Sequence, residues 1–512
     1  MRRIGIDVGG TNTDAVLIED GKVAGAVKAP TSEDVTTGIL DSLKALGATG
    51  VLKGKKLDGV MIGTTHFINA VVQRRHLTKV GALRLGMPAS ASLPPFCDWP
   101  EDLADLVRGG VWMVEGGHEY DGRLFMPLDE AAVTKAAEEM KSKGLKSVAI
   151  SAIFSPLDPT HEKRAAELVT KVIPDAVITC SSDLGRIGLL ERENAGLLNA
   201  ALADLSRDTI AAFEKAIRDS GIAAPLFITQ NDGTVAEASQ ARRLPVYSFA
   251  SGATNSMRGA AYLSGLSDAM VIDVGGTTTD VGQLKNGFPR EANSVVKVGG
   301  VRTLFRMPDL LSIGLGGGSH VQLDPLKVGP ISVGYRLMRD GIAFGGKQLT
   351  TTDVAIAMGV LTLGDKAKVA HLDAATCRKV FAEAARLSEE AIDRMKTEAG
   401  DVPLIAVGGG AFLIPEKLPG VSKVIHVQHG DCANAVGAAI AQVSGECDQI
   451  FKDLSRTEAL AAAQGIASDR AVAAGAERKS LSTIESEDMP LAYLPGNSVR
   501  VRVRVVGDVA GS

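Results

Sequence analysis

The stretch IDVGGTNTD at residues 6–14 returns almost unchanged as IDVGGTTTD at residues 272–280. The two copies lie 266 positions apart, and eight of their nine residues are identical. A spacing this long excludes a solenoid, in which repeats return every 20–50 residues or so. The duplication therefore predicts two related domains that face each other.

The first copy belongs to a pattern that differs from a dinucleotide-binding fold. Residues 3–8 and 15–18 have the composition of strands, and Gly9-Gly10 separates them. A third strand pattern follows, then a helix expected from residue 33 to Leu46, then a further strand. A glycine turn that leads into a strand lacks the helix N-terminus of a Rossmann loop. The order β-β-β-α-β thus excludes that fold.

Each copy carries groups that suit a phosphate chain. Glycines let backbone N–H groups approach an anion, and the relevant ones are Gly9, Gly10, Gly275 and Gly276. Hydroxyl donors are supplied by Thr11, Thr13, Thr277, Thr278 and Thr279. Asp7 and Asp273 end their strands and offer carboxylates to Mg²⁺ or to an attacking nucleophile. We predict two loops that clamp a polyphosphate; the alternative is a pair of ordinary hairpin turns, with Asp14 and Asp280 as turn caps.

A third glycine cluster follows the strand pattern at residues 404–407. It consists of Gly408, Gly409 and Gly410. A glycine turn after a strand lets the sugar or base of a nucleotide lie flat against the backbone. We expect these three residues to contact the adenosine of a nucleotide.

Composition narrows the function class. The 512 residues are 45% hydrophobic and 22% charged, which excludes disordered and collagen-like chains. The formal net charge of −5 offers no basic field for nucleic acid. No run of 18 apolar residues and no export signal stands out, so we expect no membrane association. Five widely spaced cysteines without a C-x-x-C pair favour a cytoplasmic location.

A series of short motifs runs along the chain. They are GTT at 63–65 with Asn69-Ala70, Ser155-Pro156 with His161-Glu162, Glu191-Arg192-Glu193, QNDG at 230–233, Ser251-Gly252, the repeat at 273–280, SIG at 312–314 with GGGS at 316–319, VGP at 328–330, Thr352-Asp353 and GGG at 408–410. In this order the chain resembles the hydantoinase/oxoprolinase family, which includes N-methylhydantoinase A and 5-oxoprolinase. That family is similar in turn to the actin-like ATPases, a superfamily of sugar kinases, heat-shock chaperones and actin.

The resemblance implies an α/β fold of two duplicated ribonuclease-H-like domains with ATP in the cleft between them. It implies Mg²⁺ held through waters by Asp7 and Asp273, and a second hydantoinase-type subunit as partner; a homo-oligomer also stays open. We place the first half at 1–265 with an insertion at about 76–145, the second half at 266–445, and a C-terminal helical segment and strand tail at 446–512.

The motifs that resemble the family also supply candidate substrate residues. These are Thr64, Thr65, Asn69, Glu191, Arg192, Asn231, Asp232 and Ser251. For Glu191 and Arg192 the alternative is a helix start whose acids face the helix dipole favourably. The family patterns SGPAGG and QSDGG are replaced here by SGATNS at 251–256 and QNDGT at 230–234. These changes leave the identity of the amide open.

Three further patterns have weaker functional interpretations. A metal or a structural role is open for His66, His161, His320 and the pair His426 and His429. Residues 341–347 mimic a phosphate-binding P-loop, but Gln348 replaces the Ser or Thr that would hold Mg²⁺. Valine and arginine alternate over residues 499–505, which predicts an edge strand with an arginine face or, alternatively, a docking edge for a partner.

Together the residues and the resemblance predict one component of an ATP-dependent amidohydrolase. Such an enzyme transfers the γ-phosphoryl group to the carbonyl oxygen of a cyclic amide, lactam or hydantoin, and water then attacks. Two alternatives from other classes are a small-molecule kinase and an ATP-gated regulatory protein.

Overall fold

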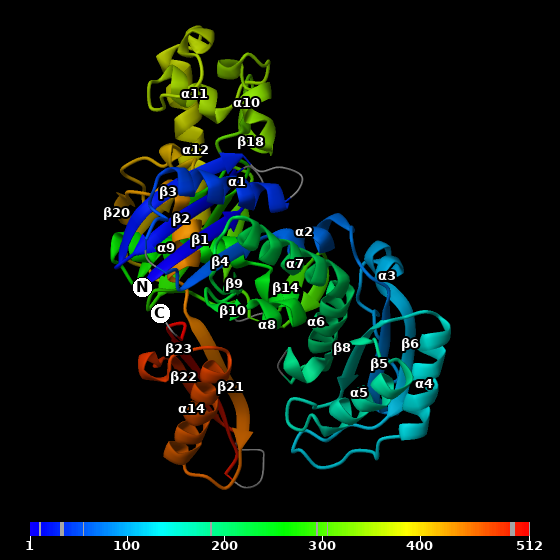
Figure 1. Cartoon of the computed structure of the whole chain (residues 1–512). Coiled ribbons are helices and arrows are strands. Elements are labelled where there is room, and N and C mark those ends of the chain that lie inside the picture. The colour runs from blue at the N-terminus through cyan, green and yellow to red at the C-terminus, as the bar shows by residue number, and fades with distance from the viewer. Residues whose placement is uncertain are drawn as a thin grey trace.

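The computed structural model contains several sheets and many helices, and the α/β class expected from the sequence is confirmed (Figure 1). The structure describes residues 1–9, 12–30, 35–54, 56–184, 187–292, 295–304, 306–491 and 497–510. Within these ranges no helix is both long enough and apolar enough to cross a membrane.

The repeated stretch lies in two mixed sheets of matching topology. The first sheet contains, in spatial order, β3 (Lys22–Pro30), β2 (Asn12–Glu19), β1 (Arg2–Val8), β4 (Gly59–Thr64) and β9 (Leu226–Thr229). The second contains β13 (Phe288–Pro289), β12 (Thr279–Lys285), β11 (Ala269–Val274), β19 (Val402–Val407) and β20 (Val421–His426). In both, the first three strands along the chain pair antiparallel and the next two join parallel.

Apolar side chains hold helices against both sheets. In the first sheet, Ile6 and Leu17 pack in one buried cluster with Ile39 and Leu43 of α1 (Val35–Ala48). The start expected at residues 33 and 34 lies outside the described residues. Phe213 of α7 (Ala203–Asp219) completes this cluster. The second sheet packs on α12 (Ala374–Met395), so each sheet has its own core.

Two short helices connect the two sheets, and glycines let them touch. They are α9 (Ser251–Ser264) and α13 (Ala433–Ile440). A Cβ atom on Gly259 would lie 1.8 Å from the carbonyl oxygen of Ala433, and one on Gly437 would lie 1.8 Å from that of Asn255. No side chain fits at that distance, so both positions require glycine for the helices to pack backbone to backbone.

A separate lobe holds a four-stranded parallel sheet, on the right in Figure 1. Its spatial order is β6 (Arg108–Glu115), β5 (Val80–Met87), β7 (Ser147–Ala152) and β8 (Val177–Cys180). Helices α3 (Glu101–Val107), α4 (Glu130–Ser142) and α5 (Thr160–Val172) connect the strands. The chain enters through α2 (His66–Gln73) and leaves through α6 (Leu189–Ala201). The sheet therefore continues past residue 145, where we expected the insertion to end.

The C-terminal residues extend the first sheet. β21 (Val443–Phe451) pairs with β10 (Val235–Glu237), which pairs with β9. β23 (Val499–Gly507) lies between β21 and β22 (Ser482–Pro490), with α14 (Arg456–Ala473) packed on its valines. The expectation of an edge strand at 499–505 is therefore wrong. Carboxylates on both neighbouring strands and beyond neutralise the arginine face, which lets it lie inside the sheet.

The remaining elements pack around these sheets, and several of them lie at the top of Figure 1. They are α8 (Ala238–Arg243), β14 (Val296–Val298), β15 (Val301–Thr303), β16 (Leu310–Ile313), β17 (Ser319–Leu323), β18 (Leu326–Ser332), α10 (Leu337–Asp340) and α11 (Thr351–Ala357). Residues 342–344 form a 3₁₀ turn after α10, so the P-loop mimic lacks the strand that would precede a true P-loop.

Candidate active site

Asp7, near the end of β1, shares a row of side chains with charged residues on the next two strands. Asp14 of β2 lies opposite Asp7, and Lys28 of β3 lies opposite Asp14. Directly opposed residues project from the same face of a sheet. The Lys28 ammonium lies 2.9 Å from both carboxylate oxygens of Asp14 and donates to the Asp431 carbonyl at 3.0 Å. Asn434 of α13 donates its amide to Asp7 at 2.8 Å.

A second row has the same construction around Asp273. Asp280 of β12 lies opposite Asp273 of β11, and Ser312 of β16 lies opposite Asp280. The Ser312 hydroxyl donates a hydrogen bond to the Asp280 carboxylate. The two rows thus differ at their third member, which is a lysine in the first sheet and a serine in the second.

Burial and mutual repulsion change the protonation of these carboxyl groups. Burial, with the charges of Asp14 and Asp273, raises the pKa of Asp7 to about 8. Burial, with the charges of Asp280 and Asp14, raises the pKa of Asp273 to about 6. Lys28 opposes both increases. The charge of Asp273 therefore reaches Asp7, although the two residues belong to different sheets.

The residues that flank the turn after each aspartate form the same backbone hydrogen bond. The N–H of Gly9 donates to the carbonyl of Asn12 at 3.1 Å, and the N–H of Gly275 donates to the carbonyl of Thr278 at 2.9 Å. Gly276 is partly exposed, and Thr277 and Thr278 are exposed at the tip of the second turn. The predicted residues Gly10 and Thr11 of the first turn lie outside the described residues.

Two threonines predicted to contact phosphate point away from the turns. The Thr279 hydroxyl is buried and donates to the Leu315 carbonyl at 2.8 Å. Thr13 is also buried, and its hydroxyl would lie 2.8 Å from a Cβ atom on Gly38 of α1. The physical reason is strand alternation, since each threonine precedes an aspartate that occupies the face of the predicted site. We therefore withdraw both from the set of predicted phosphate contacts.

A glycine run at residues 316–318 supports the second turn. The N–H of Gly317 donates to the carbonyl of Gly275 at 3.0 Å, and the N–H of Gly318 donates to that of Gly276 at 2.7 Å. A Cβ atom on Gly316 would lie 2.7 Å from the backbone of the same turn. The sequence motif was visible at 316–319, but only the fold brings it against the turn.

The cluster at residues 408–410 lies on the other side of Asp273. A Cβ atom on Gly408, whose φ is +89°, would lie 2.3 Å from a carboxylate oxygen of Asp273. The N–H of Gly410 donates to the carbonyl of Val274 at 2.7 Å. Gly409 is exposed, with no atom within 4 Å of its Cβ position. The middle glycine thus presents open backbone next to the site.

The candidate substrate residues Thr64 and Thr65 follow a glycine that lies against Asp7. Gly63 of β4 is opposite Asp7, and a Cβ atom there would lie 2.8 Å from its carboxylate. The next residue, Thr64, accepts a hydrogen bond from the buried Ser251 hydroxyl at 3.0 Å through its carbonyl. Thr65 accepts a hydrogen bond from the exposed Asn69 amide at 3.2 Å. The GTT motif thus begins next to the aspartate and leads into α2, which carries Asn69.

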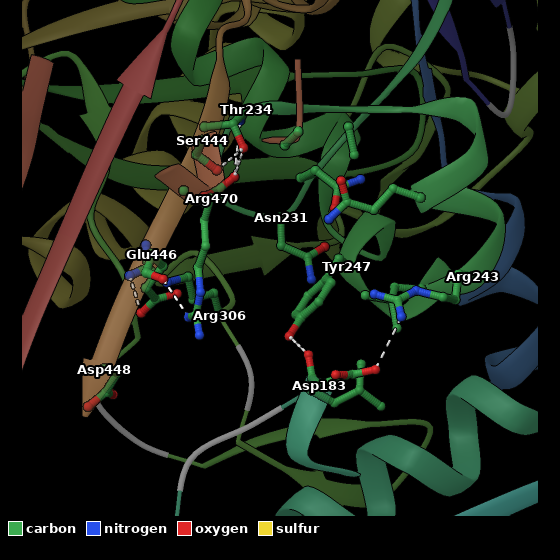
Figure 2. Close-up of a pocket in the computed structure, with 18 of the residues that line it drawn as sticks. Asp183, Asn231, Thr234, Arg243, Tyr247, Arg306, Ser444, Glu446, Asp448 and Arg470 are labelled. Atoms are coloured by element: carbon green, nitrogen blue, oxygen red, sulfur yellow. Dashed lines mark hydrogen bonds and ion pairs between the residues drawn. The ribbon is translucent and has the colours of Figure 1, made fainter. Parts of the chain in front are cut away.

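Two other candidates, Asn231 and Asp232, lie in the loop after β9 and are already engaged. The Asn231 side chain donates to the Val246 carbonyl at 3.0 Å and accepts from the Ala250 N–H at 2.8 Å. Asp232 accepts from the Thr234 hydroxyl at 2.6 Å and pairs with Arg504 at 3.2 Å. Both border a cavity of about 640 Å³ that Figure 2 shows in close-up.

The candidate substrate residues Glu191 and Arg192 lie elsewhere in the structure. Arg192 is buried within the parallel lobe, where it donates to the Ser181 hydroxyl at 2.9 Å and the Ile187 carbonyl at 2.7 Å. Burial lowers its pKa to about 10. A substrate-binding role for Arg192 is therefore wrong, because its donors are used inside the protein. Glu191 is mostly buried and pairs with Arg302 at 2.6 Å.

The sequence left the roles of several histidines open, and the structure does not bring them together at one metal site among the residues it describes. His161 accepts the Gly117 N–H at 2.8 Å and packs on His118, with ring centroids 4.7 Å apart. Among the residues that the structure describes, no group of three or more His, Cys, Asp or Glu side chains is arranged to hold a metal ion.

The sequence analysis did not single out two residues of the site, Lys28 and Asn434. Neither residue belongs to a recognisable motif.

Two sequence models of one family match the chain. The hydantoinase/oxoprolinase N-terminal region matches residues 3–173, and the hydantoinase/oxoprolinase model matches residues 192–397. The chain belongs to the hydantoinase/oxoprolinase family. The resemblance drawn from the motifs is thereby confirmed. Both aspartate rows lie within the matched ranges, whereas Asn434 and the cluster at 408–410 lie after them.

Relatives of this hydantoinase/oxoprolinase chain include a subunit of a lactamase and a subunit of a carboxylase. The caprolactamase subunit alpha of Pseudomonas jessenii is 29% identical over 403 residues, covering 71% of this chain and 55% of the relative. The acetone carboxylase beta subunit of Xanthobacter autotrophicus is 26% identical over 399 residues, covering 70% of this chain and 54% of the relative. The chain thus spans a little over half the length of these relatives.

A solved structure shares the fold of this hydantoinase/oxoprolinase chain. The ATP-dependent caprolactamase from Pseudomonas jessenii superposes with a TM-score of 0.79 at 21% identity, covering 99% of this chain and 87% of that chain. The mixed α/β architecture of several sheets is therefore shared with that enzyme.

Proposed function

We propose that this protein is a component of an ATP-dependent enzyme that activates the carbonyl group of an amide or lactam. One observation carries the proposal: Asp7 and Asp273 lie near the ends of matching strands, each before a turn closed by the same backbone hydrogen bond, and the charge of Asp273 raises the pKa of Asp7. Two matching sheets of this kind support a duplication with a nucleotide cleft between the halves. A single hairpin turn would explain neither the two matching sheets nor the effect of the Asp273 charge on Asp7.

In this proposal the two turns hold the phosphates of ATP. The turn after Asp7 is proposed to face the phosphates from one side, and the backbone of residues 276–278 supplies donors from the other. Thr277 and Thr278 add exposed hydroxyls. The open backbone at Gly409 receives the adenosine, since a side chain there would occupy the space that a flat base needs.

The residues present fit a magnesium ion. Mg²⁺ prefers oxygen ligands, keeps several waters, and is commonly held by one or two carboxylates together with substrate phosphates. Asp7 and Asp273 supply those carboxylates. Their raised pKa values come from burial near like charges, which a divalent cation would relieve. A cation there would neutralise phosphate charge during transfer.

The protein's own part in the chemistry is to position the reactants and to neutralise the charge of the phosphates. The amide oxygen attacks the γ-phosphorus, and the bond from that phosphorus to the leaving oxygen of ADP breaks. Water then adds to the carbon that bears the phosphorylated oxygen, the amine leaves with a proton, and a second water hydrolyses the resulting acyl phosphate to carboxylate and phosphate. An ionised aspartate at this site accepts the proton that the attacking water gives up.

The relatives favour carbonyl activation over transfer to an alcohol. Caprolactam and acetone, named in the relatives, share a carbonyl oxygen as the nucleophile that phosphate could capture. A carboxylase component is therefore the second candidate, in which the activated ketone meets CO₂ instead of water. The relatives are named as subunits, so we propose that a second subunit completes this enzyme as well.

The test is ATP turnover of the purified chain with Mg²⁺ and a panel of lactams, hydantoins, linear amides and ketones, with and without bicarbonate. The panel is repeated with the product of each neighbouring gene added. Phosphate release matched by ring opening or amine release supports the amidohydrolase. Bicarbonate-dependent turnover with a ketone favours the carboxylase. A stable phosphorylated product favours a kinase, and turnover indifferent to every compound favours a regulatory ATPase; either result overturns the proposal.

A further inference from the structure

The cavity of about 640 Å³ lies where strands of two sheets end (Figure 2). Pro156 follows β7, Asp183 lies just after β8, and Gln230 follows β9, and all three line it. The opposite wall is β21 with the end of α14. The carboxyl ends of parallel strands and the junctions between domains are the usual places for ligand sites in α/β proteins.

This cavity is distinct from the Asp7 site, although both lie along one sheet edge. β1, β4 and β9 are consecutive parallel strands. Neighbouring strands are about 4.8 Å apart, so the end of β9 lies roughly 10 Å from the end of β1. Between them, the Asn255 amide donates to the Thr229 hydroxyl at 3.0 Å next to Gly63. The cavity is thus a neighbouring compartment and not part of the phosphate loops.

The charges on the cavity walls are paired with one exception. Each of the lining carboxylates has an arginine partner. The pairs are Asp183 with Arg243 at 3.3 Å, Asp232 with Arg504 at 3.2 Å, Glu446 with Arg306 at 2.6 Å and Asp448 with Arg500 at 2.6 Å.

The exception is Arg470 of α14. Its guanidinium donates to the Glu446 carbonyl at 2.7 Å, which holds the side chain against β21. Among the residues that the structure describes, it forms no ion pair with a carboxylate. One lining cation is therefore left to pair with a ligand, and it is held in place by a backbone contact.

The rest of the lining sets the size and the character of the ligand. Leu184, Leu244 and Leu304 supply apolar surface, and the Tyr247 hydroxyl donates to the Asp183 carbonyl at 3.2 Å. A ligand with two or more negative charges could pair only one of them with Arg470, and the others would be repelled by the four lining carboxylates. A ligand with one negative charge and a short apolar body matches this environment.

We infer that this cavity binds a small organic monocarboxylate, whose carboxylate pairs with the Arg470 guanidinium. The inference goes beyond the proposed function, because binding here needs neither ATP nor the aspartate rows. It also separates two classes of amide: lactams that bear a carboxylate, and their amino acid products, can occupy the cavity, whereas neutral lactams cannot use Arg470.

The test is calorimetric binding without nucleotide. The probes are acetate, 6-aminohexanoate and 5-oxoproline, and 2-pyrrolidinone, which has the oxoproline ring without its carboxylate. At least one carboxylate should bind, and 5-oxoproline should bind at least about tenfold more tightly than 2-pyrrolidinone. Arg470→Gln should remove that difference. Arg456→Gln is the matched control, since Arg456 lies on the same helix but pairs with Asp488 outside the cavity.

A second variant guards against an indirect effect of Arg470→Gln. Ala473→Trp, one turn along α14 and also on the cavity wall, fills the space and should abolish carboxylate binding while Arg470 remains. Thermal melting shows whether each variant is folded. Absence of binding by every carboxylate, or equal affinity of 5-oxoproline for the wild type and Arg470→Gln, overturns the inference. Absence of ATP turnover leaves this result unaffected, so the two proposals fail separately.

Discussion

Asp7 and Asp14 face each other across β1 and β2, and the charge of Asp14 adds to burial in raising the pKa of Asp7. Lys28, on the third strand, pairs with Asp14 and so partly offsets that repulsion. The row Asp7-Asp14-Lys28 is therefore a unit in which the protonation of one member depends on the others. Its counterpart, Asp273-Asp280-Ser312, has no cation.

Replacing either strand-end aspartate tests the proposed reaction centre. Asp7→Asn and Asp273→Asn should each lower ATP turnover at least about a hundredfold, because each removes a carboxylate proposed to hold Mg²⁺. Phosphate release measures the loss, and circular dichroism should show the folded state intact. Asp20→Asn, in an exposed turn after β2, is the control. Full turnover in both variants would remove the aspartates from the mechanism.

Binding of Mg²⁺ with a non-hydrolysable ATP analogue should release protons. With a pKa of about 8, Asp7 is mostly protonated at pH 7, and a cation binds its ionised form. Affinity should therefore rise as pH increases from 6 to 8, by about tenfold per unit for one displaced proton, and level off above 8. Calorimetry in buffers of different ionisation enthalpy measures the release. Asp7→Asn should release fewer protons; an unchanged count would place the proton elsewhere.

Two neighbouring glycines should respond in opposite ways to the same substitution. Gly408→Ala puts a methyl group 2.3 Å from Asp273 at a positive φ, so thermal stability and nucleotide affinity should both fall. Gly409→Ala meets no protein atom within 4 Å, so the melting temperature should stay unchanged while nucleotide affinity falls. Melting curves and nucleotide titrations separate the two. Normal nucleotide affinity in Gly409→Ala would contradict the adenosine assignment.

The corrected position of Arg192 predicts a loss of stability instead of a loss of substrate affinity. Arg192→Met leaves the Ile187 carbonyl and the Ser181 hydroxyl without their donor in a buried region, which should cost about 2–4 kcal/mol of unfolding free energy. Urea denaturation measures this cost. Arg207→Met, on the exposed face of α7, should change stability by less than about 1 kcal/mol. Similar losses in both variants would argue against a buried role.

The local parts of the fold could be predicted from the sequence because their signals are local. Residues 3–8 and 15–18 do form strands separated by a glycine turn, and the same pattern recurs around Asp273. Apolar alternation and glycine at a turn act over a few residues, so no knowledge of distant contacts is needed.

Predictions that depended on a partner far along the chain were less successful. The alternating valines and arginines of β23 suggested an edge strand, because the carboxylates that neutralise the arginines lie on β21 and β22. Arg192 was predicted to bind substrate, because nothing in its neighbourhood along the chain shows that its side chain is buried against the parallel lobe.

By itself, the sequence determined the repeated aspartate and glycine turns, the α/β class and the family, all of which follow from short stretches of residues. Only the tertiary structure decided that Asn434 reaches Asp7, that Lys28 joins Asp14, and that Arg470 lies at the wall of a cavity against the Glu446 carbonyl. The physical reason is that charge and burial depend on what surrounds a side chain in space. Residues more than four hundred positions apart meet at Asp7 only after both sheets and the helices between them have formed.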